Sequence, residues 1–569
     1  MTQPADGSPS PDWAGGEPRR DGSQGALAGS AAPATRPATS LGRASAIMAM
    51  GSLASKILGM VRTSMLAGAL GVVAAADAFG IANTAPNIIF TLLNGGVLNA
   101  VLIPQITKAM KRPDGGRDFV DRLLTAAFAA IALVTVLAIA ATPWVVDVTS
   151  SLQGAPLHLA VLFGYLTLPQ IFFYGVYAVL GNVLNARDQF AAFMWAPALA
   201  NVVQITGLAA FLVQWGKHDS ALGWTMPMIW TLAGTATLGI IAQAFVLIPP
   251  LVKGGFRWRP RWGLRGQGMG AASRMLGWTL TALVIAQVGG IVVSNALTSL
   301  NGPGRGGVER PGYAAYNNAL MIFFLPHGLL TVSILTALFP RMTRVWNERD
   351  VRGLRALVVQ GLTVPAVGII PATALVVALA HPIVQAIFPG LRASEVDGVA
   401  RSLQLMSLGL LAFGISTLQQ RYSFAREEGR QNLAYQVLLS VVQVGFALAA
   451  WFLVPPRWGL ATVSLGLAVS NWMVSIVFIA VANRQLGGMG LGRVLGLWTR
   501  LLIASAAGAS TAWLVSYGMT MFRPGWVMSV LVCVLGGIAF GLVFLAGAKL
   551  LRILEVDELT SPIRRRLPF

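Results

Sequence analysis

The sequence has few of the residues on which catalytic and metal sites depend. It holds one cysteine, Cys533, in 569 residues, which excludes an internal disulfide and a metal site built on cysteines. Its four histidines show no spacing typical of metal ligands: His158, His218, His327 and His381. No nucleophile–base pair and no pair of carboxylates stands out, so an enzyme working within the membrane is disfavoured.

Charge is also scarce. Only 11% of the residues are charged and 55% are hydrophobic, with a mean hydropathy of +0.68, whereas a soluble domain carries about 25% charged residues. This composition is that of a polytopic membrane protein. The net charge of +20 suggests nucleic-acid binding at first sight. However, 32 of the 41 basic residues fall in alternate loops and the two termini, seven in the other loops, and two, Lys56 and Arg62, in an apolar segment.

This asymmetry follows the positive-inside rule and accounts for most of the basicity without nucleic acid. It predicts a multi-pass protein of the cytoplasmic membrane with both termini in the cytoplasm and with loops that attract anionic lipids. Fourteen apolar segments are long enough to cross a hydrocarbon core of about 30 Å. They lie at about 45–70, 75–105, 120–147, 157–184, 190–215, 224–252, 270–299, 313–340, 356–388, 401–424, 432–454, 459–483, 495–518 and 524–550.

Two segments outside the apolar region are recognisable by composition. Residues 1–42 are rich in Pro, Gly, Ser and Ala without periodicity, which predicts a disordered cytoplasmic tail. The basic loop 253–269 falls between the sixth and seventh helices, where a domain boundary is expected. Its FRWRPRW run resembles a nucleic-acid patch, but an interfacial linker with an aromatic belt is the simpler interpretation.

The stretch 52–104 is the most informative one, because it is apolar and yet contains Lys56, Arg62 and Asp77. An ionisable group at bilayer depth costs about 2.5–3.5 kcal/mol even on lenient scales, so these groups should line a cavity rather than face lipid. On a helix, Lys56 and Arg62 share an arc of roughly 120° with small and hydroxyl residues. Two alternatives stay open: Lys56 could snorkel to the headgroups, and Asp77 could cap the second helix instead of forming a gate.

Proline interrupts several of the expected helices. Pro86 lies in the second and Pro326 in the eighth, and both are candidate hinges for a rocking transporter. Simple kinks required by packing are the alternative. The second half of the chain has amides and hydroxyls but no carboxylate at depth, so it offers no proton relay. A cationic cavity with hinged helices fits alternating access for an anionic substrate, and the fork of arginine suits a diphosphate. A membrane scaffold would leave Lys56 and Arg62 unexplained.

Five stretches in register resemble the MurJ (MviN) family of lipid II flippases, within the superfamily of multidrug, oligosaccharidyl-lipid and polysaccharide exporters. The first is SKILGMVRTSMLAGALGVVAAADAFGIANTAPNIIF, with its basic residue, LG and Arg, DAF and PN. The others are LPQIFFYGVYAVLGNVLNARDQF with APALAN, LPHGLLTVSILTALFPRMT, ALAHPIVQAIF and RYSFAREEGRQN. The resemblance covers roughly 43–550.

The resemblance implies an all-α protein with two six-helix bundles around a central cavity, 43–252 and 270–485. It also implies two C-terminal helices, 486–550, that form a groove for a lipid tail, before a basic cytoplasmic tail, 551–569. The implied function is flipping of undecaprenyl-diphosphate-linked disaccharide pentapeptide to the outer leaflet, without enzymatic chemistry and with no metal. Lys56 and Arg62 match the family's cavity basic residues and Asp77 its outer-gate aspartate. The alternative is export of another polyprenyl-linked saccharide, or of drugs, within the same superfamily.

The chain departs from the family at two places. Phe90 and Thr91 stand where relatives carry one or two arginines, and an apolar stretch near Leu320 and Met321 replaces an arginine before the proline of the eighth helix. The diphosphate would therefore rest on Lys56 and Arg62, with further contacts expected from three polar residues nearby: Asn83, Thr84 and Asn94. The absence of carboxylates in the second half argues against sodium coupling, whereas a cationic cavity would couple to membrane potential. We expect a monomer without a cofactor.

Overall fold

A computed structural model describes residues 38–92, 117–187, 189–263, 273–302, 310–522 and 525–556. The chain divides into two units, Met1–Ala46 and Ile47–Phe569, and the features described below belong to the second. Throughout the described ranges the chain is helical or irregular, without strands, as the sequence predicts for an all-α membrane protein.

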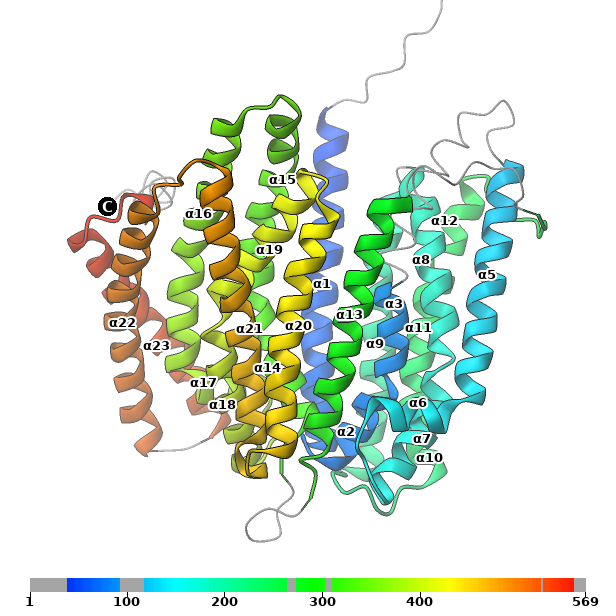
Figure 1. Ribbon diagram of the computed structural model, residues 1–569. Coiled ribbons are helices and arrows are strands. Elements are labelled where there is room, and N and C mark those ends of the chain that lie inside the picture. The colour runs from blue at the N-terminus through cyan, green and yellow to red at the C-terminus, as the bar shows by residue number, and fades with distance from the viewer. Residues whose placement is uncertain are drawn as a thin grey trace, which may run out of the picture. The chain divides into compact units, whose positions relative to one another are not determined.

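The residues up to the linker form short and long helices (Figure 1). These are α1 (Ala38–Leu70), α2 (Ala74–Ala82), α3 (Thr84–Leu92), α5 (Arg117–Ala140), α6 (Thr142–Thr149), α7 (Ala155–Thr167), α8 (Gln170–Ala186), α9 (Phe190–Trp215), α10 (Met226–Ile229), η2 (Trp230–Gly234), α11 (Thr235–Phe245) and α12 (Ile248–Lys253).

The residues after the linker continue the helical pattern. They form α13 (Ser273–Thr298), α14 (Tyr313–Pro326), η4 (His327–Thr331), α15 (Val332–Asn347), α16 (Val351–Ala378), α17 (Ala380–Ile387), α18 (Ala393–Ser407), α19 (Leu410–Ala425), α20 (Gly429–Phe452), α21 (Pro456–Gln485), α22 (Leu491–Phe522) and α23 (Trp526–Leu550).

Twelve helices in the described ranges are long and apolar enough to cross a membrane, and a bent pair makes a thirteenth. The bent pair is α18 with α19, which meet at 52° and correspond to the expected segment 401–424. The expected segment 75–105 begins with α2 and α3 but runs beyond the described residues after Leu92. The predicted membrane architecture is therefore confirmed, while the count of fourteen is not.

The two candidate hinge prolines lie at breaks. Pro86 is in α3, just after the chain turns at Asn83 between α2 and α3. Pro326 ends α14 and is followed at once by the π-helical turn η4. Proline removes an N–H and crowds the preceding turn, so the backbone hydrogen bonds rearrange there. Single π turns often occur at functional sites in helices. Whether either proline acts as a hinge stays a prediction.

Helix α1 lies at the seam between the residues before and after the linker. Figure 1 shows α5, α8, α9 and α11 on one side of it and α16, α21, α22 and α23 on the other. The side-chain amide of Asn201 in α9 donates to the carbonyl of Ser55 at 3.0 Å. The hydroxyl of Ser64 donates to the carbonyl of Ile387 in α17 at 2.6 Å. A helix tied to both sides is well placed to line a space between them.

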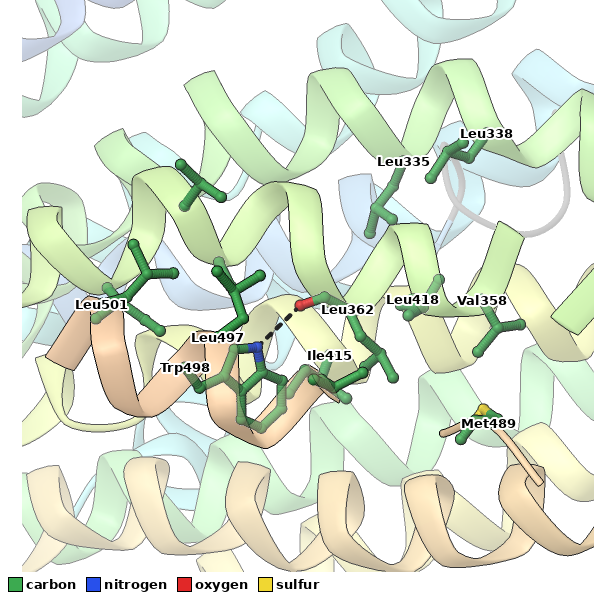
Figure 2. Packing of buried hydrophobic residues seen from close by; sticks show 14 of the residues in the cluster. Leu335, Leu338, Val358, Leu362, Ile415, Leu418, Met489, Leu497, Trp498 and Leu501 are labelled. Atoms are coloured by element: carbon green, nitrogen blue, oxygen red, sulfur yellow. Dashed lines mark hydrogen bonds between the residues drawn. The ribbon is translucent and has the colours of Figure 1, made fainter. Parts of the chain in front are cut away.

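The last two helices belong to the core of the second half. Helix α22 packs on α16 and α23. The indole N–H of Trp498 donates to the carbonyl of Leu362 at 3.2 Å (Figure 2), three residues before Pro365 in α16. A buried tryptophan usually finds such a partner, because its N–H would otherwise lose a hydrogen bond to water. Helix α22 is thus fixed against α16 in one register.

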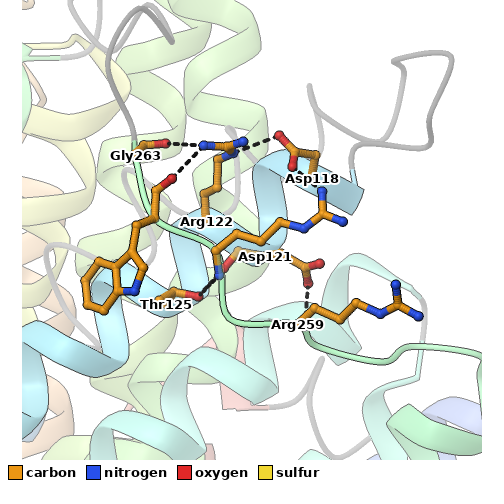
Figure 3. Close-up of polar contacts among 8 residues, drawn as sticks. Asp118, Asp121, Arg122, Thr125, Arg259 and Gly263 are labelled. Atoms are coloured by element: carbon orange, nitrogen blue, oxygen red, sulfur yellow. Dashed lines mark hydrogen bonds and ion pairs between the residues drawn. The ribbon is translucent and has the colours of Figure 1, made fainter.

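The basic linker is docked on the first turns of α5 (Figure 3). The backbone N–H of Arg259 donates to Asp121 at 3.2 Å, and that of Arg261 to the hydroxyl of Thr125 at 3.0 Å. The guanidinium of Arg261 pairs with Asp118, and Arg122 donates to the carbonyl of Trp262 at 2.6 Å. These contacts account for the carboxylates of α5 and for part of the linker's positive charge. The aromatic belt itself stays a prediction.

Candidate functional site

A cavity of about 470 Å³ lies between α1, α2, α3, α8, α9, α11 and α14. Arg62 is the one charged side chain among the described residues that line it. The other polar lining groups are amides and hydroxyls: Thr63, Asn83, Asn87, Gln170, Tyr174, Gln204, Thr235, Tyr313, Asn317 and Asn318. A single guanidinium among neutral hydrogen-bonding groups suits an anion with several oxygens.

Arg62 is partly buried and is oriented by α9. Its Nη1 donates to Gln204 Oε1 at 3.1 Å, which uses one of its five N–H groups. The salt bridges found among the described residues involve other side chains. The guanidinium is therefore positioned in the cavity by a neutral neighbour, with donors left for a ligand.

The other predicted ligands are spread more widely. Asn83 lines the cavity, although its amide nitrogen also donates to the carbonyl of Phe79 at 2.8 Å. Thr84 does not line the cavity. Its hydroxyl lies 3.1 Å from the hydroxyl of Tyr313, and Tyr313 does line the cavity. Lys56 is exposed and does not line the cavity. It lies six residues before Arg62, roughly 9 Å away along the axis of α1. Asn94 lies outside the described residues. The roles of all four in binding stay predictions.

Of the two places where the resemblance leads us to expect arginine, Met321 lines this cavity and Phe90 contacts one of its lining residues. Met321 contributes to the wall on the α14 side, one turn after Asn317 and Asn318. Phe90 packs its ring on Tyr174, with the two centroids 4.8 Å apart, and Tyr174 faces the cavity. A thioether in the wall and a tilted pair of aromatic rings beside it therefore stand where the resemblance leads us to expect positive charge. Arg62 carries the charge alone among the described lining residues.

Asp77 closes one end of this cavity. It is fully buried in α2, and its two carboxylate oxygens accept from the backbone N–H groups of Tyr313, at 2.9 Å, and Ala314, at 2.6 Å. These are the first two residues of α14, whose N–H groups lack partners within their own helix. The carboxylate thus caps a helix 236 residues away and joins the two halves of the chain. We call this end of the helices the Asp77 end.

A second carboxylate also links the two halves: Glu395 of α18, in the second half, binds groups of the first half. It is 2% exposed and accepts from the backbone N–H of Val72, at 3.3 Å, just after α1. Its other oxygen accepts from Lys217 Nζ at 2.9 Å. Gly71, at φ +67°, leaves the space that Glu395 occupies, because a Cβ there would collide with the carboxylate. Glu395 was missed in the sequence because it precedes the segment expected to span the membrane.

Polar contacts between α6 and α13 also join the two halves at the Asp77 end. The hydroxyl of Ser294 donates to the carbonyl of Thr149 at 2.7 Å, and the amide of Asn295 donates to the carbonyl of Val148 at 2.9 Å. The backbone N–H of Ser151 donates to the hydroxyl of Thr298 at 2.9 Å. The halves are therefore joined at the Asp77 end by hydrogen bonds that rigid-body separation would break.

Replacing Glu395 with glutamine should loosen the Asp77 end without changing its shape. The substitution keeps the size of the side chain but removes a charge that is hydrogen-bonded to Lys217, an interaction worth about 1.5–3 kcal/mol. A cysteine placed at Ser151 in a Cys533→Ser background should then react several-fold faster with a membrane-impermeant maleimide. Glu428→Gln is the matched control, because Glu428 pairs with Arg426 only two residues away in the same turn. This variant should leave the rate unchanged. Equal rates in all three proteins would contradict a gate role for Glu395.

A family model and the curated relatives of this chain carry the same family description. A model described as "Lipid II flippase MurJ" matches residues 66–535, which include Asp77 and most of the cavity but begin after Lys56 and Arg62. The probable lipid II flippase MurJ of Synechocystis sp. is 25% identical over 543 residues, which cover 93% of this chain and 98% of the relative.

Two solved structures show the same fold. A lipid II flippase MurJ in an inward closed conformation has a TM-score of 0.67 at 16% identity, covering 89% of this chain and 99% of that chain. An inward-facing multidrug resistance MATE family transporter of the MOP superfamily has a TM-score of 0.61 at 16% identity, covering 76% and 95%. Because the family model spans well over half of the residues, the chain belongs to the lipid II flippase MurJ family.

Proposed function

We propose that this protein is a lipid II flippase, which moves a polyprenyl-diphosphate-linked disaccharide pentapeptide across the membrane by alternating access and has no enzymatic step. The observation that carries this proposal is membership of the family over 66–535. The cavity agrees with it, because its one charged lining group in the described residues is a guanidinium. Such a site favours an anionic substrate over the cationic drugs that an acidic cavity would take.

The diphosphate is the part of the substrate that this cavity suits. Arg62 can donate two parallel hydrogen bonds to phosphate oxygens, and the amides of Asn87 and Asn318 offer further donors. A volume of about 470 Å³ is typical of a drug-sized ligand. We assign this space to the diphosphate and the first sugar, and the exposed side of α1 around Lys56 to the remaining headgroup.

A separate apolar cavity of about 740 Å³ is a candidate for the lipid tail. It lies between α16, α19, α21 and α22, and three tryptophans, Trp472, Trp498 and Trp513, contribute to its walls. The lining of this cavity is almost entirely apolar, so it can hold a polyprenyl chain without placing the chain against water or polar groups. The groove supports the role that the resemblance gives to the C-terminal helices.

Transport in this scheme depends on opening the Asp77 end. In the proposed orientation, with both termini in the cytoplasm of a plasma-membrane protein, this end faces outward and the linker end inward. The structure then corresponds to a state closed on the outside. Opening requires the contacts of Asp77 and Glu395 to break, while Pro86 and Pro326 stand where α3 and α14 could bend. We expect a monomer to suffice.

Complementation of a conditional flippase mutant tests the function directly. A bacterium depleted of its own lipid II flippase should grow and keep its shape when this chain is expressed. A strain that makes the protein at normal level in the membrane and still lyses would contradict the proposal. An exporter of another polyprenyl-diphosphate saccharide is the remaining candidate, and rescue of a strain blocked in that export instead would favour it.

The positive cavity should also respond to membrane potential. An elementary charge moved across the field is worth about 2.3 kcal/mol per 100 mV, so a negative cytoplasm should draw the empty cavity to its inward-facing state. Flipping in vesicles should therefore accelerate under a potassium–valinomycin potential that is negative on the linker side. Rates that do not depend on the potential would contradict this coupling. A sodium gradient alone should have no effect, since the one buried carboxylate among the described residues of the second half, Glu395, is already paired with Lys217.

A further inference from the structure

A second cationic cavity lies at the Asp77 end of the second half, away from Arg62. It measures about 160 Å³, roughly the space of five water molecules. Three arginines line it: Arg310 before α14, Arg401 in α18 and Arg457 in α21. Asp397 is the one carboxylate among the described lining residues, and it already pairs with His381.

The three arginines are unusual for their position. The loops expected on the outer side carry seven of the 41 basic residues, and three of these seven converge on this one small space. The single carboxylate of Asp397 leaves this lining with a net positive charge, so an anion is electrostatically favoured in the space. Arg401 also lies over the ring of Trp458, with 5.7 Å from its Cζ to the ring centroid, and this contact restrains its guanidinium.

The walls of the cavity are built to accept an anion. Ser402 lines it and is 1% exposed, and its hydroxyl has no hydrogen-bond partner. A buried hydroxyl without a partner is costly, and a ligand oxygen would satisfy it. Helix α21 also begins at the cavity, with Pro456 in its first turn, and its N-terminal amides add positive potential there. The first turn of α18, which reaches the cavity through Ser394, is already capped by Glu395.

We propose that this cavity binds a phosphate group at the outer end of the second half, with Arg401, Arg457 and the hydroxyl of Ser402 as its main donors. The space is too small for a sugar chain and suits one tetrahedral oxyanion. Free phosphate, an outer-leaflet phospholipid headgroup and the diphosphate of a polyprenyl lipid all present this chemistry. The site is distinct from the central cavity, so it does not depend on Arg62.

Binding of radiolabelled inorganic phosphate to the full chain, purified in a maltoside detergent that carries no phosphate, tests the site. Arg457→Gln should weaken binding by about tenfold or more, since a charge-assisted hydrogen bond is lost. Arg484→Gln is the matched control, because Arg484 lies in the last turn of the same helix. Arg62→Gln should leave this component of binding intact. Ser402→Ala should weaken binding without lowering the melting temperature, since its hydroxyl has no partner to lose.

Competition then identifies the source of the phosphate. Displacement of the label by phosphatidylglycerol in mixed micelles indicates a headgroup site, and displacement by undecaprenyl diphosphate indicates a site for the polyprenyl lipid. If neither lipid competes, the ligand is free phosphate. Binding that Arg457→Gln and Ser402→Ala leave unchanged, or that only Arg62→Gln removes, overturns the proposal. Because complementation is measured separately, failure of this site and failure of the flippase function give different results.

Discussion

Replacing Arg62 with alanine should abolish growth support in a flippase-depleted strain while the protein still inserts into the membrane. Arg62 is the one charged group among the described residues that line the central cavity, and Met321 stands in the wall on the opposite helix. Without the guanidinium, a diphosphate would be partly desolvated and unpaired, which costs about 3–5 kcal/mol. That loss corresponds to a decrease in affinity of two to three orders of magnitude or more.

Two further variants make this result specific. Arg62→Lys should retain partial function, because the ammonium keeps the charge but loses the planar fork. Lys56→Ala should have a milder effect, because Lys56 is exposed and outside the cavity lining. Membrane levels of each protein are measured by quantitative blotting. Normal growth with Arg62→Ala at normal level would remove Arg62 from the binding site.

Asp77→Ala should have the second large effect, by shifting the equilibrium from the state closed at the Asp77 end to the open state. The substitution leaves the N–H groups of Tyr313 and Ala314 without their charged partner. Two charge-assisted hydrogen bonds are worth about 3 kcal/mol or more, enough to shift a two-state equilibrium more than a hundredfold. The expected result is loss of complementation together with strong maleimide labelling of a cysteine at Ser151. Asp77→Asn, which keeps acceptor capacity on one atom, should be intermediate.

The location of the gate makes a clean control available. Asp350 caps α16 at the linker end by accepting from Gly353 at 2.8 Å, which is local helix capping without a link between halves. Asp350→Ala should therefore cost about 1 kcal/mol of stability but leave labelling at Ser151 unchanged. If Asp77→Ala and Asp350→Ala had the same consequences, Asp77 would be an ordinary cap and not a gate.

The membrane architecture could be predicted from the sequence because hydropathy and loop charge report directly on the solvent of each segment. The expected segment 190–215 coincides with α9, for example. The breaks were harder to place. The segment 401–424 is divided between two helices, α18 and α19, which meet at 52°. Helix α18 also begins eight residues before the expected start, at Ala393. Its polar first turns, with Ser394 and Glu395, concealed it from a hydropathy argument.

The part of the candidate site around Arg62 could be predicted from the free-energy cost of placing a charged group in an apolar helix. A lone arginine in an apolar helix must face something polar, and Arg62 does. The partner of Asp77 could not be predicted, because the N–H groups of Tyr313 and Ala314 carry no sequence signal and lie 236 and 237 residues away. Glu395 and the cavity at Arg457 likewise depend on contacts across the fold, which periodicity within one helix does not report.

The most direct measurement of the central claim is the equilibrium binding of lipid II to the purified protein by native mass spectrometry. The account predicts binding by the unmodified chain and a loss of two orders of magnitude or more in Arg62→Gln. Binding should also weaken sharply when a lipid-linked saccharide with no diphosphate replaces lipid II. Equal affinity of the unmodified chain and Arg62→Gln for lipid II would contradict the account.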